Sequence, residues 1–148
     1  MSAGVPVRIL LAEDDDDDFY LTREAFKEAH LLNELRRVRD GEELMDYLLH
    51  RGVYSAQDSA PEPALILLDL NMPRKDGREA LREIKSDPVL RRYPVVVLTT
   101  SHAEEDIVRS YELGVNSFIS KPVTFPGLLD AVRVLGRYWF EIVELPVT

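Results

Sequence analysis

Polar residues follow four of the apolar runs in this sequence, and the hydrophobic context of the runs does not require them. They are Glu13 and Asp14, then Asp69, then Thr99, and finally Ser120 with Lys121. Continuous apolar runs are typical of strands that are buried on both faces of a parallel sheet. Because the carboxyl ends of parallel strands share one edge, we expect these side chains to meet in one crevice.

Three carboxylates, a hydroxyl group and an ammonium group in one crevice favour one kind of chemistry. Carboxylates at close range repel one another and usually need a cation, and a small set of hard oxygen donors suits Mg²⁺. Lys121 would then lie opposite the metal as a point charge for a carboxylate or a phosphate. The set therefore predicts phosphoryl transfer to an aspartate, in which catalysis is positioning plus charge neutralisation.

Each of these residues also has a simpler structural explanation. Asp14 or Asp15 could cap a helix that begins after the first run, and Thr99, Thr100 or Ser101 could cap a later one. Lys121 alone would be an ordinary exposed lysine. Residues 13–18 are all acidic, which is typical of a solvated tract, although here the tract directly follows a buried strand. The predicted site therefore rests on the whole set and not on any single member.

The elements that must position these residues alternate between strands and helices. The predicted strands are residues 7–12, 34–38, 64–68, 95–98 and 118–119, of which the second is polar enough for a sheet edge. Apolar stripes at helical spacing predict five helices: Leu21, Ala25, Phe26 and Ala29; Leu44, Tyr47 and Leu48; Ala80, Leu81 and Ile84; Ile107, Val108 and Tyr111; Leu128, Leu129, Val132 and Leu135. This alternation predicts a doubly wound α/β sheet, with residues 50–63 as a surface loop.

Composition limits the classes of function. A chain of 148 residues, 45% hydrophobic and 30% charged, predicts one globular domain. The net charge of −9 argues against nucleic acid as a partner. The chain contains no cysteine, has no apolar run of membrane-spanning length and begins without signal-peptide features, so we expect a cytoplasmic protein.

Five segments carry a resemblance to a known family. They are residues 9–15 (ILLAEDD), Asp40-Gly41, residues 67–73 (LLDLNMP) with Asp76-Gly77, residues 96–99 (VVLT), and Ser120-Lys121-Pro122. In this order and spacing the sequence resembles the receiver domain of bacterial two-component response regulators over residues 7–136. The resemblance implies a single domain with its core at about 7–136 and a C-terminal tail at 137–148. The resemblance implies a flavodoxin-like fold in which five helices surround a five-stranded parallel sheet of strand order 2-1-3-4-5.

The resemblance also implies roles for the acidic residues and their neighbours. Asp69 corresponds to the phosphoacceptor nucleophile. Asp14 corresponds to a direct Mg²⁺ ligand, Glu13 to a ligand that assists through water, and Asn71 to a residue that offers its backbone carbonyl. The implied function is phosphorylation of Asp69 by a histidine kinase in a Mg²⁺-dependent reaction.

The remaining motif residues correspond to the part of the family that responds to the phosphate. Thr99 matches the switch hydroxyl that bonds the phosphate, and Lys121 matches the lysine that pairs with it. Phe118 lies at the switch aromatic position, where it could equally be a core phenylalanine. Pro122 would follow a cis peptide bond, which is tolerated before proline.

A narrower resemblance concerns the partner. Residues 94–102, 111–113 and 139–146 look like the small response regulators that partner phytochrome-type histidine kinases, so a bacteriophytochrome is the expected donor. About ten residues follow the fifth helix, so we expect no fused output domain. The signal would pass either to a histidine phosphotransfer protein or directly to a target, and the sequence leaves both open.

The fifth helix and the tail suggest a homodimer. Leu128, Val132, Leu135, Trp139 and Ile142 follow a heptad-like spacing, which is typical of a helix–helix seam. An equally good interpretation is that the early members face the sheet and the late ones fold back over it.

The sequence disfavours two other classes of function. A haloacid dehalogenase-type phosphatase would place a second acid two residues after the nucleophile, but that position is Asn71. A pseudo-receiver, which folds but is never phosphorylated, is disfavoured by the complete set of motif residues. We therefore expect no enzymatic activity beyond self-catalysed phosphorylation and dephosphorylation.

Overall fold

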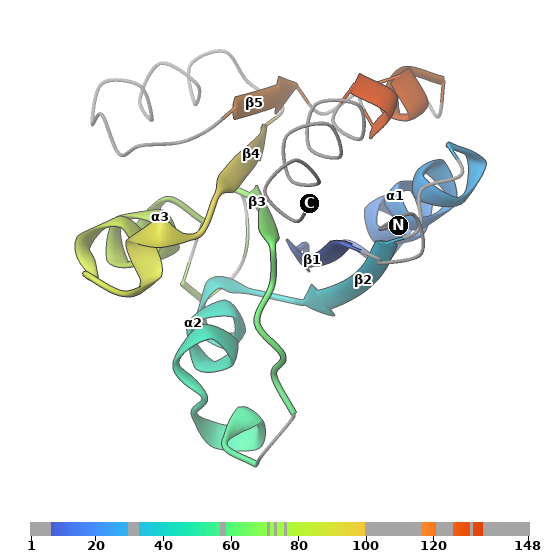
Figure 1. Cartoon of the computed structure of the whole chain (residues 1–148). Coiled ribbons are helices and arrows are strands. Elements are labelled where there is room, and N and C mark those ends of the chain that lie inside the picture. Colours follow the sequence, from blue (N-terminus) through green and yellow to red (C-terminus); the bar gives the residue numbers. More distant parts are fainter. Residues whose placement is uncertain are drawn as a thin grey trace, which may run out of the picture.

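The computed structural model describes residues 7–29, 33–56, 59–70, 72, 74–75, 77–99, 117–120, 126–130 and 132–134. Within these residues a five-stranded sheet has the order β2-β1-β3-β4-β5, and all four pairings are parallel (Figure 1). Its strands are β1 Val7–Ala12, β2 Asn33–Val38, β3 Leu65–Asp69, β4 Val95–Thr99 and β5 Ser117–Ser120. The predicted doubly wound parallel architecture is confirmed, and β2 lies at an edge as its polar sequence indicated.

Three helices have defined bounds: α1 Asp16–Glu28, α2 Gly41–Leu49 and α3 Gly77–Ser86. Two short 3₁₀ turns, η1 Gly52–Tyr54 and η2 Leu90–Arg92, lie in the connections, and residues 126–130 and 132–134 are helical. Side-chain oxygens cap the first two helices, as Asp15 accepts from the Asp18 amide at 2.9 Å and Asp40 from the Glu43 amide at 2.7 Å. The predicted fourth helix around Ile107 lies outside the described residues.

The two faces of the sheet bury alternate residues of its strands against different helices. Leu10 and Leu68 belong to a cluster with residues of α2 and α3. Leu11 and Leu67 belong to a second cluster with residues of α1 and of the helical segment near residue 130. Figure 1 shows these helices on opposite sides of the sheet. This arrangement follows from the period of two along a strand.

One position of the predicted core stripe of α1 is wrong. Leu21 is 39% exposed, and its neighbour Thr22 is buried at 5% exposure. The buried face therefore runs through Thr22, Ala25 and Phe26 at spacings of three and one. Thr22 can be buried because its hydroxyl donates a hydrogen bond of 2.8 Å to the Asp18 carbonyl.

The helical residues near 130 bear on the heptad-like spacing. Val132 is buried at 4% exposure in the cluster with α1, and Leu128 and Leu129 pack against that cluster. Val132 thus serves the core of this chain, as the alternative interpretation held for the early seam positions, whereas Leu128 is only partly buried. Leu135, Trp139 and Ile142 lie outside the described residues.

Within the described residues, no helix is long and apolar enough to cross a membrane.

Candidate functional site

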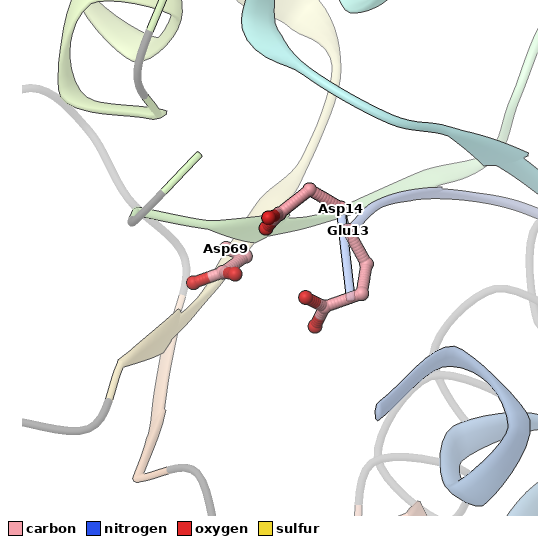
Figure 2. Close-up of side chains that lie close together, drawn as sticks. All are labelled: Glu13, Asp14 and Asp69. Carbon is pink, nitrogen blue, oxygen red and sulfur yellow. The ribbon is translucent and has the colours of Figure 1, made fainter. Parts of the chain in front are cut away.

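Three carboxylates meet where two neighbouring strands end. Glu13 and Asp14 follow β1, and Asp69 is the last residue of β3. Because Ala12 pairs with Leu68, the next residues of both strands lie at the same level of the sheet. One carboxylate oxygen from each of the three side chains lies within 4.8 Å of the others, as Figure 2 illustrates. The predicted convergence of Glu13, Asp14 and Asp69 is therefore present in the structure.

The three carboxylates differ in exposure. Glu13 and Asp69 are buried, at 1% and 3% exposure, whereas Asp14 is exposed. Burying two charged groups so close together is unfavourable unless positive charge compensates them. A set of hard oxygen donors with one side open to solvent suits a divalent cation such as Mg²⁺. The chemistry of this donor set therefore fits the predicted metal.

The residues of the acidic tract have different roles, since one caps α1 and others belong to the site. Asp15, and not Asp14, is the N-cap of α1. The Asp15 amide also donates to Oε2 of Glu13 at 3.3 Å. Asp14 lies between the strand and the cap, and its carboxylate is directed toward Asp69 in Figure 2. Of the two capping candidates, the structure selects Asp15 and leaves Asp14 free for the site.

Arg37 on β2 contacts the segment that carries these acids, and sequence reasoning missed it. Its Nε donates to the backbone carbonyl of Glu13 at 2.9 Å, and its Nη1 lies 2.8 Å from the Asp16 carboxylate. The hydrogen bond from Arg37 lowers the pKa of Asp16 below its usual value. In addition, the Glu13 amide donates to the Val38 carbonyl at 2.9 Å. The connection after β1 is thus fixed from the edge strand.

Two glycines of the motif segments allow close backbone approaches to the connection between β3 and α3. The Gly77 amide donates to the Leu70 carbonyl at 3.0 Å, and a Cβ at Gly77 would lie 2.3 Å from the Asp69 carbonyl oxygen. The Gly41 amide likewise donates to the Lys75 carbonyl at 2.8 Å, and a Cβ there would lie 2.1 Å from that oxygen. These contacts give a physical reason for glycine in both Asp-Gly segments.

The Asp40 side chain links the connection between β3 and α3 to α2. Besides capping α2, its carboxylate lies 3.3 Å from the guanidinium of Arg74, a residue with a φ of 63°. Asp40 is buried at 6% exposure, whereas the Arg74 side chain is mostly exposed. The connection between β3 and α3 is therefore attached to α2 by both backbone and side chain.

The remaining predicted site residues are described only in part. In the backbone register Asp69 pairs with Leu98, and Thr99 pairs with Ser120, which places the ends of β4 and β5 at the same edge of the sheet as Asp69. The side chains of Thr99, Phe118 and Ser120 lie outside the described part of the chain. So do Asn71, Lys121 and Pro122, and the peptide bond before Pro122 with them.

Comparisons with known proteins agree with this geometry. The response regulator receiver domain family matches residues 9–133. Response regulator Rcp1 of Synechocystis sp. is 47% identical over 141 residues, which are 95% of this chain and 94% of that protein.

Solved structures give the same result. The phosphorylated cyanobacterial phytochrome response regulator RcpA has a TM-score of 0.81 and 46% identity, with 92% of this chain and 95% of that chain covered. The Mn²⁺-bound form of Rcp1 has a TM-score of 0.79 and 46% identity, covering 90% and 94%. The bacteriophytochrome response regulator RtBRR has a TM-score of 0.77 and 45% identity, covering 89% and 79%. This chain therefore belongs to the response regulator receiver domain family, and it is related to the phytochrome response regulators.

Proposed function

We propose that this chain is a single-domain response regulator that accepts a phosphoryl group on Asp69 from a histidine kinase. The observation that carries the proposal is the convergence of Glu13, Asp14 and Asp69 within 4.8 Å at the ends of β1 and β3. Phosphoryl acceptance is general in the receiver family to which the chain belongs. Asp69 is the acceptor in this proposal because it ends the central strand and is buried beside the other two acids.

Glu13, Asp14 and Asp69 would hold a Mg²⁺ ion together with the backbone carbonyl of Asn71. The Mn²⁺-bound structure of Rcp1 supports a divalent cation in a relative of this chain. When bound, Mg²⁺ supplies positive charge that offsets the charge of the carboxylates and of an incoming phosphoryl group. The protein contributes the donors and their placement at the sheet edge.

In the proposed reaction a carboxylate oxygen of Asp69 attacks the phosphorus atom of a phosphohistidine. A P–O bond forms, the P–N bond breaks, and the electron pair leaves with the histidine of the kinase. Lys121 would pair with the transferred phosphoryl oxygens, and the hydroxyl of Thr99 would donate to one of them. Phe118 would move when Thr99 moves toward the phosphoryl group. Beyond this reaction and the hydrolysis of the aspartyl phosphate, the proposal includes no separate enzyme activity.

The proposed donor is a phytochrome-type histidine kinase in the cytoplasm. The similarity to RcpA and RtBRR, which are described as phytochrome and bacteriophytochrome response regulators, supports this partner. The proposed next step is either transfer of the phosphoryl group to a histidine phosphotransfer protein or direct binding of a target by the phosphorylated form. The domain is proposed to span residues 1–148, with a fourth and a fifth helix completing the five-helix fold and a homodimer formed through the fifth helix and the tail.

The proposal is tested by phosphorylating the wild-type chain and Asp69→Asn with acetyl phosphate and Mg²⁺. The wild type should gain the mass of one phosphoryl group, and peptide mapping should place it on Asp69. The Asp69→Asn variant keeps the shape of the side chain and should gain none. A phosphoryl group mapped to another residue of the wild type, or none in the presence of Mg²⁺, would contradict the proposal.

A further inference from the structure

One arginine on the edge strand makes three contacts with the segment between β1 and the first turns of α1. The side chain of Arg37 is only 10% exposed. Its Nε donates to the Glu13 carbonyl at 2.9 Å, its Nη1 lies 2.8 Å from the Asp16 carboxylate, and its guanidinium carbon lies 4.7 Å from the centre of the Phe19 ring. A single planar group therefore contacts Glu13 before Asp14 and also Asp16 and Phe19 after it.

These contacts require arginine and not only a positive charge. The guanidinium presents several donors in a rigid fork and stacks on aromatic rings, so it can bond a carbonyl and a carboxylate at once. A lysine at the same position could pair with Asp16 but would lack the Nε donor that reaches the Glu13 carbonyl. The bond to Glu13 is thus the contact that depends on the guanidinium.

The position of the Glu13 backbone determines where the acid pair lies. Glu13 and Asp14 are adjacent, and no secondary structure separates them from the Asp15 cap. The Glu13 amide is held by Val38 and its carbonyl by Arg37, so the peptide groups on both sides of its side chain are fixed from β2. Outer contacts of this kind orient metal ligands, and removing them typically lowers metal affinity by about 10- to 100-fold.

We infer that Arg37 is a positioning residue that holds Glu13 and Asp14 in place for a divalent cation. This inference rests on the proposed function, because it assigns Arg37 a part in the same cation site. The direction of the change in Mg²⁺ affinity distinguishes this inference from a simple effect of the Arg37 charge. Arg37 is a cation close to a cation site, so removing its charge alone should tighten Mg²⁺ binding. Removing a positioning contact should weaken it.

Arg39, the residue that follows β2, provides a matched control. Its Nη1 donates to the same Asp16 carboxylate at 3.2 Å, but its side chain is 61% exposed. Arg39→Met therefore removes one positive charge and one bond to Asp16 and leaves the Arg37 contact with Glu13 in place. We expect its affinity for Mg²⁺ to equal that of the wild type or to be slightly higher.

The test is calorimetric titration of the full chain with Mg²⁺ for the wild type, Arg37→Met, Arg37→Lys and Arg39→Met, at a temperature where each is folded. Both Arg37 variants should bind Mg²⁺ about 10-fold more weakly than the wild type. Arg37→Lys keeps the positive charge, so its loss of affinity measures the contacts that need the guanidinium, which are the bond to the Glu13 carbonyl and the packing on Phe19. It also keeps the test valid if Arg37→Met does not fold.

A second readout separates positioning from a merely structural role. The rate of Asp69 phosphorylation by acetyl phosphate, measured against Mg²⁺ concentration, should reach half its maximum at about 10-fold higher Mg²⁺ in the Arg37 variants, with the maximal rate near that of the wild type. Unchanged or tighter Mg²⁺ binding by Arg37→Lys, with normal wild-type phosphorylation, would overturn this inference alone. A wild type that neither binds Mg²⁺ nor is phosphorylated on Asp69 would overturn the proposed function and this inference together.

Discussion

The amide of Gly77 donates a hydrogen bond of 3.0 Å to the carbonyl of Leu70, which brings the first turn of α3 against the end of β3. At this approach a side chain on Gly77 would meet the Asp69 carbonyl oxygen at 2.3 Å and the Leu70 Cα at 2.6 Å. Both obstacles are backbone atoms, which cannot turn away as a flexible side chain can. The position of Asp69 therefore depends on a residue that has no side chain.

Gly77→Ala should destabilise the protein and slow its phosphorylation, because the backbone at Asp69 must move. Such overpacking typically costs about 1–3 kcal/mol of the free energy of unfolding. Urea unfolding and the rate of phosphorylation by acetyl phosphate measure the two effects. Gly52→Ala is the control, since Gly52 has a φ of 58° but a Cβ there would only approach Asp46 to 3.7 Å. It should lose about 1–2 kcal/mol of stability and keep the wild-type rate. Equal rates for Gly77→Ala and Gly52→Ala would contradict the role given to Gly77.

Asp69→Asn should stabilise the protein when no divalent cation is present. The three carboxylates repel one another, and the amide removes one charge while keeping the shape of the side chain. The same change should remove most of the stabilisation by Mg²⁺, which for the wild type is about 2.7 kcal/mol at a concentration 100 times the dissociation constant. Thermal unfolding of both proteins in EDTA and in Mg²⁺ gives the four unfolding temperatures that are compared. A wild type whose unfolding temperature is the same in EDTA and Mg²⁺ would contradict the cation site.

Asp14→Ala and Glu13→Ala should differ in their effect on phosphorylation. Asp14 is the proposed direct ligand, so its loss should abolish phosphorylation. Glu13 is proposed to act through water, so its loss should only weaken the reaction. Phosphorylation of both variants is compared across Mg²⁺ concentrations, with Asp17→Ala, an exposed change in α1, as the control. EDTA should stop the reaction in every variant. Phosphorylation that continues in EDTA, or that survives in Asp14→Ala, would exclude the assigned roles.

The sheet was predictable from sequence because buried strands are continuous in hydrophobicity. The bounds of β1 match the prediction, and β3 differs by one residue at each end. The predicted stripe of α1 included Leu21 wrongly. The buried position is Thr22, because a threonine whose hydroxyl donates to a carbonyl of its own helix can lie in the core. Asp69 and its acidic neighbours were predictable because polar residues at strand ends stand out against apolar context.

Arg37 could not have been found in the same way. It lies in a polar edge strand, where an arginine is ordinary, and its partners are a backbone carbonyl and residues of another element. The ambiguity of Val132 has a similar origin. Its heptad-like spacing fits a helix–helix seam and a helix that packs on a sheet equally well, and only tertiary structure distinguishes the two.

The stability of the chain should depend on Asp87 in acid. Its carboxylate accepts hydrogen bonds from the amides of Leu90 and Val89, which lower its pKa below the usual value of 3.8. A group whose pKa is lower in the folded state stabilises that state above its unfolded pKa, and the contribution is lost as the pH falls through the folded pKa. Asp87→Ala should therefore be less stable than the wild type at pH 7, and the difference should shrink below pH 3.8. Urea unfolding across this range measures it, and a difference that does not change with pH would show that the carboxylate charge is unimportant.

A homodimer through the tail is the last expectation to test. Because Val132 is buried in the core of its own chain, an interface would have to use the later apolar residues, which are Trp139, Phe140, Ile142, Val143 and Leu145. Burying each such side chain contributes roughly 1.5–3 kcal/mol, so removing five should abolish association even after its entropic cost. Truncation after Gly136 should therefore give a monomer in sedimentation that is still phosphorylated on Asp69. Full-length Trp139→Ala and Ile142→Ala should weaken the dimer and remain folded. A wild-type monomer at tens of micromolar would exclude the dimer. A truncated chain that does not fold, together with full-length variants of reduced stability and unchanged association, would show instead that the tail covers the core of its own chain.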